Sequence, residues 1–247
     1  MKNKISTILA LDFDGVICDS LPECYYSSYL SWFPGVDPAI PLGDMDSQNK
    51  RYKDFCLWRP YVRSGEDYLL IQSLVDKLPP PTSQDEMDDY LQKAGLDTMK
   101  SFKTKIYETR DKILKENPEV WLGLNPLFPQ LKPWLDRLSL NPKVWILSTK
   151  KPDFILRILE FQGISWDPGR VLEASGESKQ MVMDRNWGVG EPVVFLDDQP
   201  DHFMELDTRI DCWLPVWGYV KKDWIEFPGN YKILTQDKLE TFINLWV

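Results

Sequence analysis

The sequence has little of what a metal cage or a disulfide framework requires. Its 247 residues include a single histidine, His202, and four cysteines that form no C-x-x-C pair. Structural zinc sites and disulfide frameworks are built from closely spaced cysteines and histidines, so we expect neither to organise this chain. We expect His202 to be a turn residue, and we expect free thiols, as in a reducing compartment, at Cys18, Cys24, Cys56 and Cys212.

Long apolar runs and positive charge are also scarce. The N-terminal apolar run, residues 8–11, ends at Asp12 and is too short for a secretory or membrane-spanning segment, which favours a cytoplasmic protein. Lys and Arg number 29 against 38 Asp and Glu, a formal net charge of -9. Because nucleic acids and anionic membranes attract clustered positive charge, we expect neither as a partner. The composition leaves the oligomeric state open.

Short apolar segments give the first indication of a fold. Continuous apolar character without alternation is typical of strands buried on both faces of a parallel sheet. Helical patterns over residues 152–163 and 178–187 lie between the later segments, as crossover helices should. The sequence therefore predicts an α/β fold with a Rossmann-like parallel sheet, whose strands are residues 8–11, 144–147, 193–196 and 212–216, with a short fifth strand at 171–172.

A second domain is expected between the first two strands. Residues 12–143 separate them, far more than a crossover connection needs. Helical patterns over residues 51–78 and 98–116, ended by prolines, indicate that this insertion is mainly helical. We predict a Rossmann-like core formed by residues 1–20 and 125–247, and an inserted helical domain formed by residues 21–124.

Acidic residues follow two of the predicted strands. Asp12 and Asp14 come directly after the first strand, and Asp197 and Asp198 follow the third, with Asp201 three residues further on. Parallel sheets place their ligands at the carboxyl ends of the strands, so we expect these carboxylates to converge. Either group alone is an ordinary acidic turn. Together they predict a site for a hard cation such as Mg²⁺.

Hydroxyl and ammonium groups are expected at the same edge. The second strand ends in Ser148, Thr149 and Lys150 before a helix begins, a pattern that can hold a phosphoryl oxygen but that is also typical of a helix N-cap. Carboxylates crowded beside a phosphate need a cation. Lys179, at the start of the next helix, is our candidate, and Lys150 or Lys151 is the alternative.

These segments, in this order, resemble the motifs of the haloacid dehalogenase-like (HAD) hydrolase superfamily, in its phosphoglycolate-phosphatase-like branch. The resemblance rests on L-D-F-D-G-V-I-C-D-S at residues 11–20, I-L-S-T-K at 146–150, Lys179, and F-L-D-D at 195–198. Residues 125–129 and 217–219 are also similar to segments of that branch. The inserted helical domain, which carries no motif of the superfamily, would be the cap.

The resemblance implies a role for each matching residue. Asp12 would be the nucleophile that forms an aspartyl-phosphate, and Asp14 would act as general acid and base. Ser148 would bind a phosphoryl oxygen, and Lys179 would neutralise the charge of the nucleophile and the phosphate. Mg²⁺ would be held by Asp12, the main-chain carbonyl of Asp14, and Asp198.

Two assignments and the reaction class have alternatives. Asp197 could replace Asp198 at the metal, and Thr149 could replace Ser148; we favour Asp198 and Ser148. Dehalogenating relatives lack an acid two residues after the nucleophile, so Asp14 argues for phosphoryl transfer. We expect an Mg²⁺-dependent phosphatase acting on a small phosphorylated metabolite, and the alternatives are a phosphomutase and a non-catalytic binding or regulatory protein of the same fold.

Overall fold

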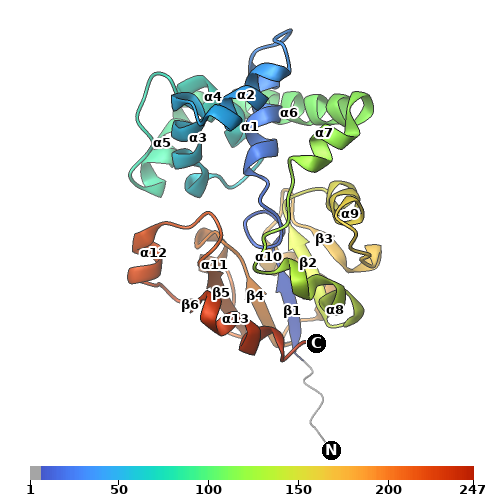
Figure 1. Cartoon of the computed structure of the whole chain (residues 1–247). Helices are drawn as coiled ribbons and strands as arrows, with labels where there is room; N and C mark the ends of the chain where they lie inside the picture. The colour runs from blue at the N-terminus through green and yellow to red at the C-terminus, as the bar shows by residue number, and fades with distance from the viewer. Residues whose placement is uncertain (1–6) are drawn as a thin grey trace, which may run out of the picture. The chain divides into compact units, whose positions relative to one another are not determined.

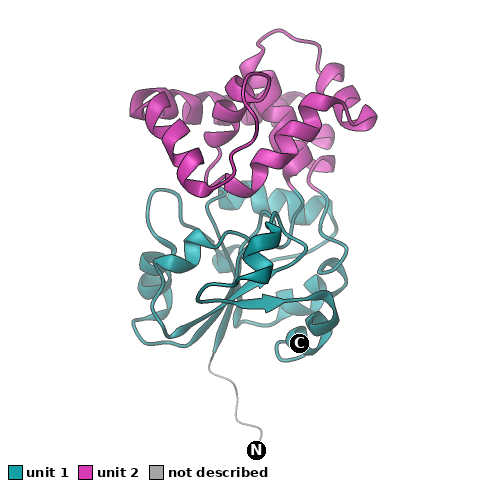
Figure 2. Ribbon diagram, turned by 90° about the vertical axis from the view of Figure 1, so that its left-hand side faces the viewer, with its two compact units in different colours: residues 1–19, 126–247 teal, residues 20–125 magenta. Residues whose placement is uncertain are grey.

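The computed structural model describes residues 7–247 of the chain. It divides into two compact units (Figure 2). One combines residues 1–19 with residues 126–247 and contains the sheet, and the other comprises residues 20–125 and is helical. Among the described residues, no helix combines the length and the apolar composition that crossing a membrane requires.

A six-stranded parallel sheet forms the centre of the first unit, with helices around it (Figure 1). The strand order is β3-β2-β1-β4-β5-β6, the arrangement of a doubly wound sheet. The chain winds in opposite directions from β1, so the ligand edge is expected where β1 and β4 end. The strands are β1 (Ile8–Leu11), β2 (Val144–Ser148), β3 (Val171–Glu173), β4 (Val193–Leu196), β5 (Ile210–Pro215) and β6 (Lys232–Leu234).

β1 and β4 end at the same level, and β2 continues for two residues beyond it. Leu11, the last residue of β1, lies opposite Ile146 of β2 and Leu196 of β4. All four residues of β1 are buried, as expected for a strand with neighbours on both sides and helices on its faces. The backbone N–H of Asp12 donates to the carbonyl of Leu196 at 2.8 Å. This register brings the residues that follow β1 and β4 side by side.

In the sheet unit, a serine cap marks the start of one helix and a glycine follows the end of another. The side chain of Ser178 accepts a hydrogen bond from the N–H of Met181 and caps α10, and Gly163, with φ of 81°, follows the end of α9. The core helices are α8 (Leu135–Leu140), α9 (Pro152–Phe161), α10 (Lys179–Trp187), α11 (Asp201–Met204), α12 (Lys222–Glu226) and α13 (Gln236–Ile243), with short 3-10 helices at η2 (Lys132–Trp134) and η3 (Pro168–Arg170). The structure confirms the predicted α/β class with an inserted helical domain.

Seven α-helices and a 3-10 helix make up the helical unit. They are α1 (Leu21–Trp32), α2 (Ala39–Ser47), α3 (Lys50–Trp58), η1 (Arg59–Tyr61), α4 (Asp67–Leu74), α5 (Gln84–Ala94), α6 (Leu96–Glu116) and α7 (Pro118–Gly123). Their core is rich in aromatic side chains, with Tyr25, Phe55 and Trp58 almost fully buried.

The prediction of helix over the whole of residues 51–78 is wrong. Pro60 is the second residue of η1 and cannot donate a backbone hydrogen bond, so the α-helical ladder stops there. The carboxylate of Asp67 then accepts hydrogen bonds from the backbone N–H groups of Arg63 and Ser64 at 2.9 and 3.1 Å. These bonds stabilise a turn, and the helix resumes as α4.

A buried ion pair lies inside the helical unit. Arg110 of α6 donates from Nε and Nη2 to the two carboxylate oxygens of Glu23 in α1, at 2.8 and 2.9 Å. Ser27 and Trp121 donate to the same carboxylate. Glu23 has no exposed surface, and so the charge is satisfied entirely by protein groups that join α1, α6 and α7.

Candidate functional site

Three carboxylates converge at the carboxyl end of the sheet. Asp12 follows β1, and Asp197 and Asp198 follow β4. Each offers an oxygen within 4.8 Å of the others, and the three residues are 6%, 0% and 4% exposed. We call these three residues the acidic cluster. Burying several carboxylates together is costly without positive charge, so the cluster needs cations beside it.

Lys179 supplies one such charge from the first turn of α10. Its side chain is 4% exposed, and its Nζ lies 2.5 Å from Oδ2 of Asp197 and 3.2 Å from Oδ1 of Asp12. Burial alone would lower the pKa of Lys179, but the negative charges of Asp12 and Asp197 raise it above its usual range. Lys179 is therefore a permanent ammonium in direct contact with the predicted nucleophile.

The environments of the Asp12 and Asp197 carboxylates differ. Burial raises the pKa of Asp12, against the lowering effect of Lys179. Burial also opposes charge on Asp197, yet electrostatic attraction and hydrogen bonds from His202 and Lys179 hold the pKa of Asp197 below its usual range. The ionised form of Asp197 is therefore stabilised by its neighbours in the acidic cluster.

His202 is closer to the site than the sequence indicated. It lies in α11, and its Nδ1 is 2.7 Å from Oδ2 of Asp197. The expectation of a turn residue is therefore wrong, because Pro200 and Asp201 start a short helix that directs the imidazole back to the strand end. The five-residue spacing from Asp197 was the available signal, but it is uninformative until that helix is known.

Asp14 is paired with a second lysine. Nζ of Lys150 donates to Oδ1 of Asp14 at 2.8 Å, and the Lys150 side chain is 4% exposed against 22% for Asp14. Lys179 and Lys150, which were alternatives at the level of the sequence, therefore sit on different carboxylates. Asp14 remains partly open to solvent, as a group that exchanges protons with substrate and water requires.

The hydroxyl groups lie at the end of β2. Ser148 is the last residue of the strand and is 1% exposed, and its Oγ accepts a hydrogen bond from the backbone N–H of Lys150 at 3.3 Å. Thr149 is half-buried in the following turn.

Two glycines let the loops close on Asp198. Gly15 has a φ of 86°, and a Cβ there would lie 2.2 Å from Oδ2 of Asp198. A Cβ on Gly218, in the turn after β5, would lie 2.6 Å from Cβ of Asp198 and 2.6 Å from the carbonyl oxygen of Gly15. Real side chains do not fit at these distances, and therefore both positions require glycine.

The acidic cluster has the chemistry of a divalent-cation site. Oδ1 of Asp12 is buried and accepts no hydrogen bond, although the ammonium of Lys179 is near it. This oxygen has an ion-pair partner but no hydrogen-bond donor, and it can therefore take a further positive partner. Oxygen-only ligands are those that hard cations prefer, so Asp12, Asp197 and Asp198 could bind a metal ion.

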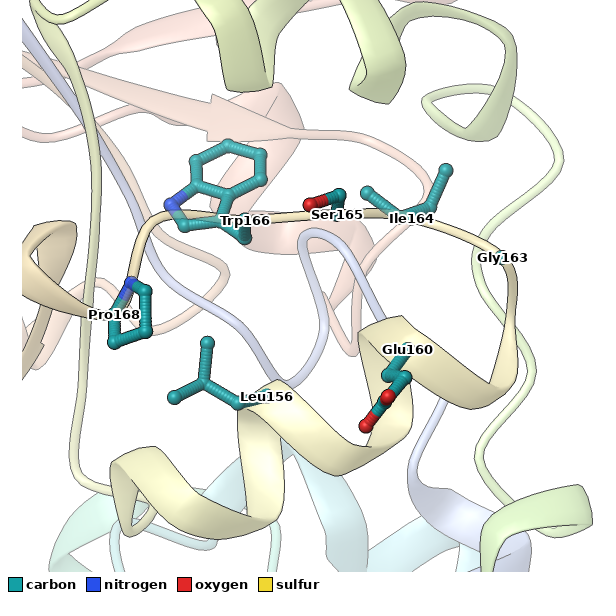
Figure 3. Close-up of a pocket in the computed structure, with 7 residues that line it drawn as sticks. All are labelled: Leu156, Glu160, Gly163, Ile164, Ser165, Trp166 and Pro168. Carbon is teal, nitrogen blue, oxygen red and sulfur yellow. The ribbon is translucent and has the colours of Figure 1, made fainter.

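A pocket of about 450 Å³ lies elsewhere in the sheet unit, between α9 and the loop that follows it (Figure 3). Leu156 and Glu160 of α9 and Trp166 of the loop are among the residues that line it. None of its lining residues belongs to the acidic cluster. It is separate from the candidate site.

Solved structures of known proteins are similar in fold to this chain. Neither a protein-family model nor a curated protein sequence matches the chain. Similar solved structures include a haloacid dehalogenase-like family hydrolase from Streptococcus pneumoniae, at 15% identity with a TM-score of 0.51, covering 96% of this chain and 98% of that one. A predicted phosphatase from Clostridium acetobutylicum has 16% identity and a TM-score of 0.56, with the same coverages.

A third similar structure is a candidate phosphoglycolate phosphatase from Lactobacillus delbrueckii subsp. bulgaricus, at 15% identity with a TM-score of 0.58, covering 96% of this chain and 98% of that one. The match thus extends over both units of the chain and not only over the sheet. It confirms at the level of the fold the resemblance carried by residues 11–20, 146–150, 179 and 195–198. The chain therefore has the fold of the haloacid dehalogenase-like hydrolases.

Proposed function

We propose that the protein is an Mg²⁺-dependent phosphatase that hydrolyses a small phosphorylated metabolite through an aspartyl-phosphate. The observation that carries this proposal is the state of Asp12. Its Oδ1 is buried, accepts no hydrogen bond, and lies among two further carboxylates and the ammonium of Lys179. Such an oxygen fits a nucleophile that also binds a metal ion. The similar structures described as phosphatases support the same reaction class.

Asp12, the main-chain carbonyl of Asp14, and Asp198 would hold the metal ion. Asp197 already accepts from Lys179 and His202 through Oδ2, and its Oδ1 accepts from the backbone N–H of Gln199 at 2.9 Å. These partners favour Asp198 over Asp197 as the ligand. Bound Mg²⁺ would offset negative charge on the phosphoryl group and orient it.

Each predicted site residue has a separate role in the proposed reaction. A carboxylate oxygen of Asp12 attacks phosphorus, the bond from phosphorus to the leaving oxygen breaks, and that oxygen takes a proton from the carboxyl of Asp14. Asp14 then takes a proton from water as the water oxygen attacks phosphorus, which releases phosphate and restores the Asp12 carboxylate. Lys179 offsets charge on Asp12 throughout. Ser148 or Thr149 would donate to a phosphoryl oxygen.

The helical unit would act as the cap. The chain enters it after the predicted nucleophile and leaves it before β2, at residues 20 and 125. In this proposal the helical unit excludes water during the first transfer and selects the metabolite.

The test is phosphate release from an aryl phosphate and a panel of phosphorylated metabolites, with Mg²⁺ and with a chelator. Asp12→Asn should abolish release, and Asp136→Asn, a change of the same size at an exposed residue of α8, should leave it intact. Release that persists in Asp12→Asn would refute the assignment of the nucleophile. Turnover that needs a sugar bisphosphate as activator would indicate a phosphomutase, and binding of phosphate without any turnover would indicate a binding protein.

A further inference from the structure

The turn after β5 contacts the candidate site through Gly218 and Tyr219. Residues 217–219, which we call the 217–219 turn, carry none of the predicted catalytic groups. The backbone N–H of Tyr219 donates to Oδ2 of Asp198 at 3.1 Å. Gly218 approaches Asp198 so closely that no side chain fits between them. One face of the Asp198 carboxylate is therefore fixed by backbone.

The same turn is fastened to the loop that follows β1. The indole Nε1 of Trp217 donates to the carbonyl of Val16 at 3.1 Å, and the hydroxyl of Tyr219 donates to Oδ1 of Asp19 at 2.6 Å. The Tyr219 ring also packs edge-on against Phe128, with ring centroids 6.2 Å apart. Tyr219 thus reaches Asp198 with its backbone and Asp19 with its side chain.

Asp19 is itself held in place. Its backbone N–H donates to the carbonyl of Pro126 at 2.8 Å, and the N–H of Phe128 donates to the carbonyl of Ile17 at 2.9 Å. The two segments of chain at the boundary of the sheet unit therefore pair with each other. Asp19 is a fixed acceptor against which the Tyr219 hydroxyl can set the position of the turn.

We propose that Tyr219 is a positioning residue for the metal ion. Its hydroxyl, anchored on Asp19, holds its backbone N–H on Oδ2 of Asp198 and so fixes the orientation of that carboxylate within the acidic cluster. This inference rests on the proposed function, because it takes Asp198 as a metal ligand. Groups that orient a ligating carboxylate raise the affinity for the metal without touching it, and their loss typically costs about 10- to 100-fold.

The test is calorimetric titration of the full-length protein with Mg²⁺ alone, in the absence of any phosphate compound. Tyr219→Phe keeps the backbone N–H and removes only the hydroxyl, so Mg²⁺ affinity should fall about tenfold, at the lower end of that range. The matched control is Tyr231→Phe, which removes a tyrosine hydroxyl that donates to the carbonyl of Trp224 at 2.9 Å in the same unit. This control should bind Mg²⁺ as the wild type does.

Changes at Asp19 give a second test. Asp19→Asn keeps an acceptor for the Tyr219 hydroxyl and should retain wild-type affinity. Asp19→Ala should weaken binding as much as Tyr219→Phe. Combining the two should weaken it no further, because both changes remove the same hydrogen bond between the Tyr219 hydroxyl and Asp19.

Each outcome has a distinct meaning. Wild-type affinity in Tyr219→Phe, or equal losses in Tyr219→Phe and Tyr231→Phe, would overturn the role of Tyr219. Asp198→Ala separates this failure from failure of the proposed function. If Asp198→Ala loses Mg²⁺ binding while Tyr219→Phe does not, only the positioning role is wrong, and if the wild type binds no Mg²⁺, the metal assignment itself is wrong.

Discussion

Replacement of Lys179 by methionine removes the positive charge that the acidic cluster shares. Methionine fills a similar volume, so the change is chiefly one of charge. At 3.2 Å and an effective dielectric constant of about 20, the pair of Lys179 with Asp12 corresponds to about 5 kcal/mol of attraction. Removing one member of a buried pair typically costs about 3 to 5 kcal/mol, because the remaining charge is left without compensation. We expect a loss of stability in that range for Lys179→Met near neutral pH.

The size of this loss should depend on pH and on metal. Burial already raises the pKa of Asp12, and loss of Lys179 should raise it further. An acid with a raised pKa in the folded state costs stability when ionised, so the deficit should shrink as the pH falls and Asp12 takes up a proton. Mg²⁺ supplies positive charge at the same place and should restore more stability to Lys179→Met than to the wild type.

Thermal unfolding with Mg²⁺ and with chelator measures both effects. The expected loss corresponds to a decrease in Tm of about 10 °C without metal. Lys222→Met is the control, since the Lys222 side chain is 86% exposed and pairs with Glu226 on the surface. A Tm for Lys179→Met within a degree or two of the wild type, unaffected by Mg²⁺, would refute the reasoning.

Three further predictions concern both units. Burial raises the pKa of Asp67 to about 6, so its ionised form costs stability above that pH; Asp67→Asn should stabilise the protein by about 1 to 3 kcal/mol near pH 8, and denaturant unfolding should show this advantage disappearing toward pH 4. A gain independent of pH would contradict this cause. Glu23→Gln leaves Arg110 buried without its counter-charge and should cost about 3 to 5 kcal/mol in denaturant unfolding, whereas Glu119→Gln on the exposed surface of α7 should change little. Gly15→Ala places a methyl group within the Asp198 carboxylate and should abolish Mg²⁺ binding in calorimetry, so retained binding would show that the loop can move aside.

The strands of the sheet could be predicted because their signal is local. The segments at β1, β2 and β4 are short, continuously apolar and followed by polar residues, and two-sided burial in a parallel sheet requires that pattern. The Lys232–Leu234 strand was not predicted, since an edge strand of three residues with one lysine has no such pattern. In the helical unit, apolar spacing continued through Pro60, and the turn there depends on the side chain of Asp67, which sequence periodicity does not report.

The convergence of Asp12 with Asp197 and Asp198 could be predicted because parallel strands end at one edge. The side chains and backbone groups that contact the site carboxylates could not be predicted. The pairing of Lys150 with Asp14 depends on the turn after β2, and the contact of His202 with Asp197 depends on the short helix α11. The contact between Tyr219 and Asp198 joins residues 21 positions apart through the conformation of a turn. Such contacts are determined by tertiary structure and leave no period in the sequence.

The central claim, that Asp12 carries the phosphoryl group, is tested most directly by trapping it. The protein is quenched in acid during turnover with Mg²⁺ and a substrate that releases phosphate, and its peptides are mapped by mass spectrometry. Asp14→Asn, which lacks the group that activates water, should accumulate phosphate on the peptide containing residue 12, and Asp12→Asn should carry none. Turnover by the wild type with no phosphate on that peptide in Asp14→Asn, or phosphate found on another residue, would contradict the account.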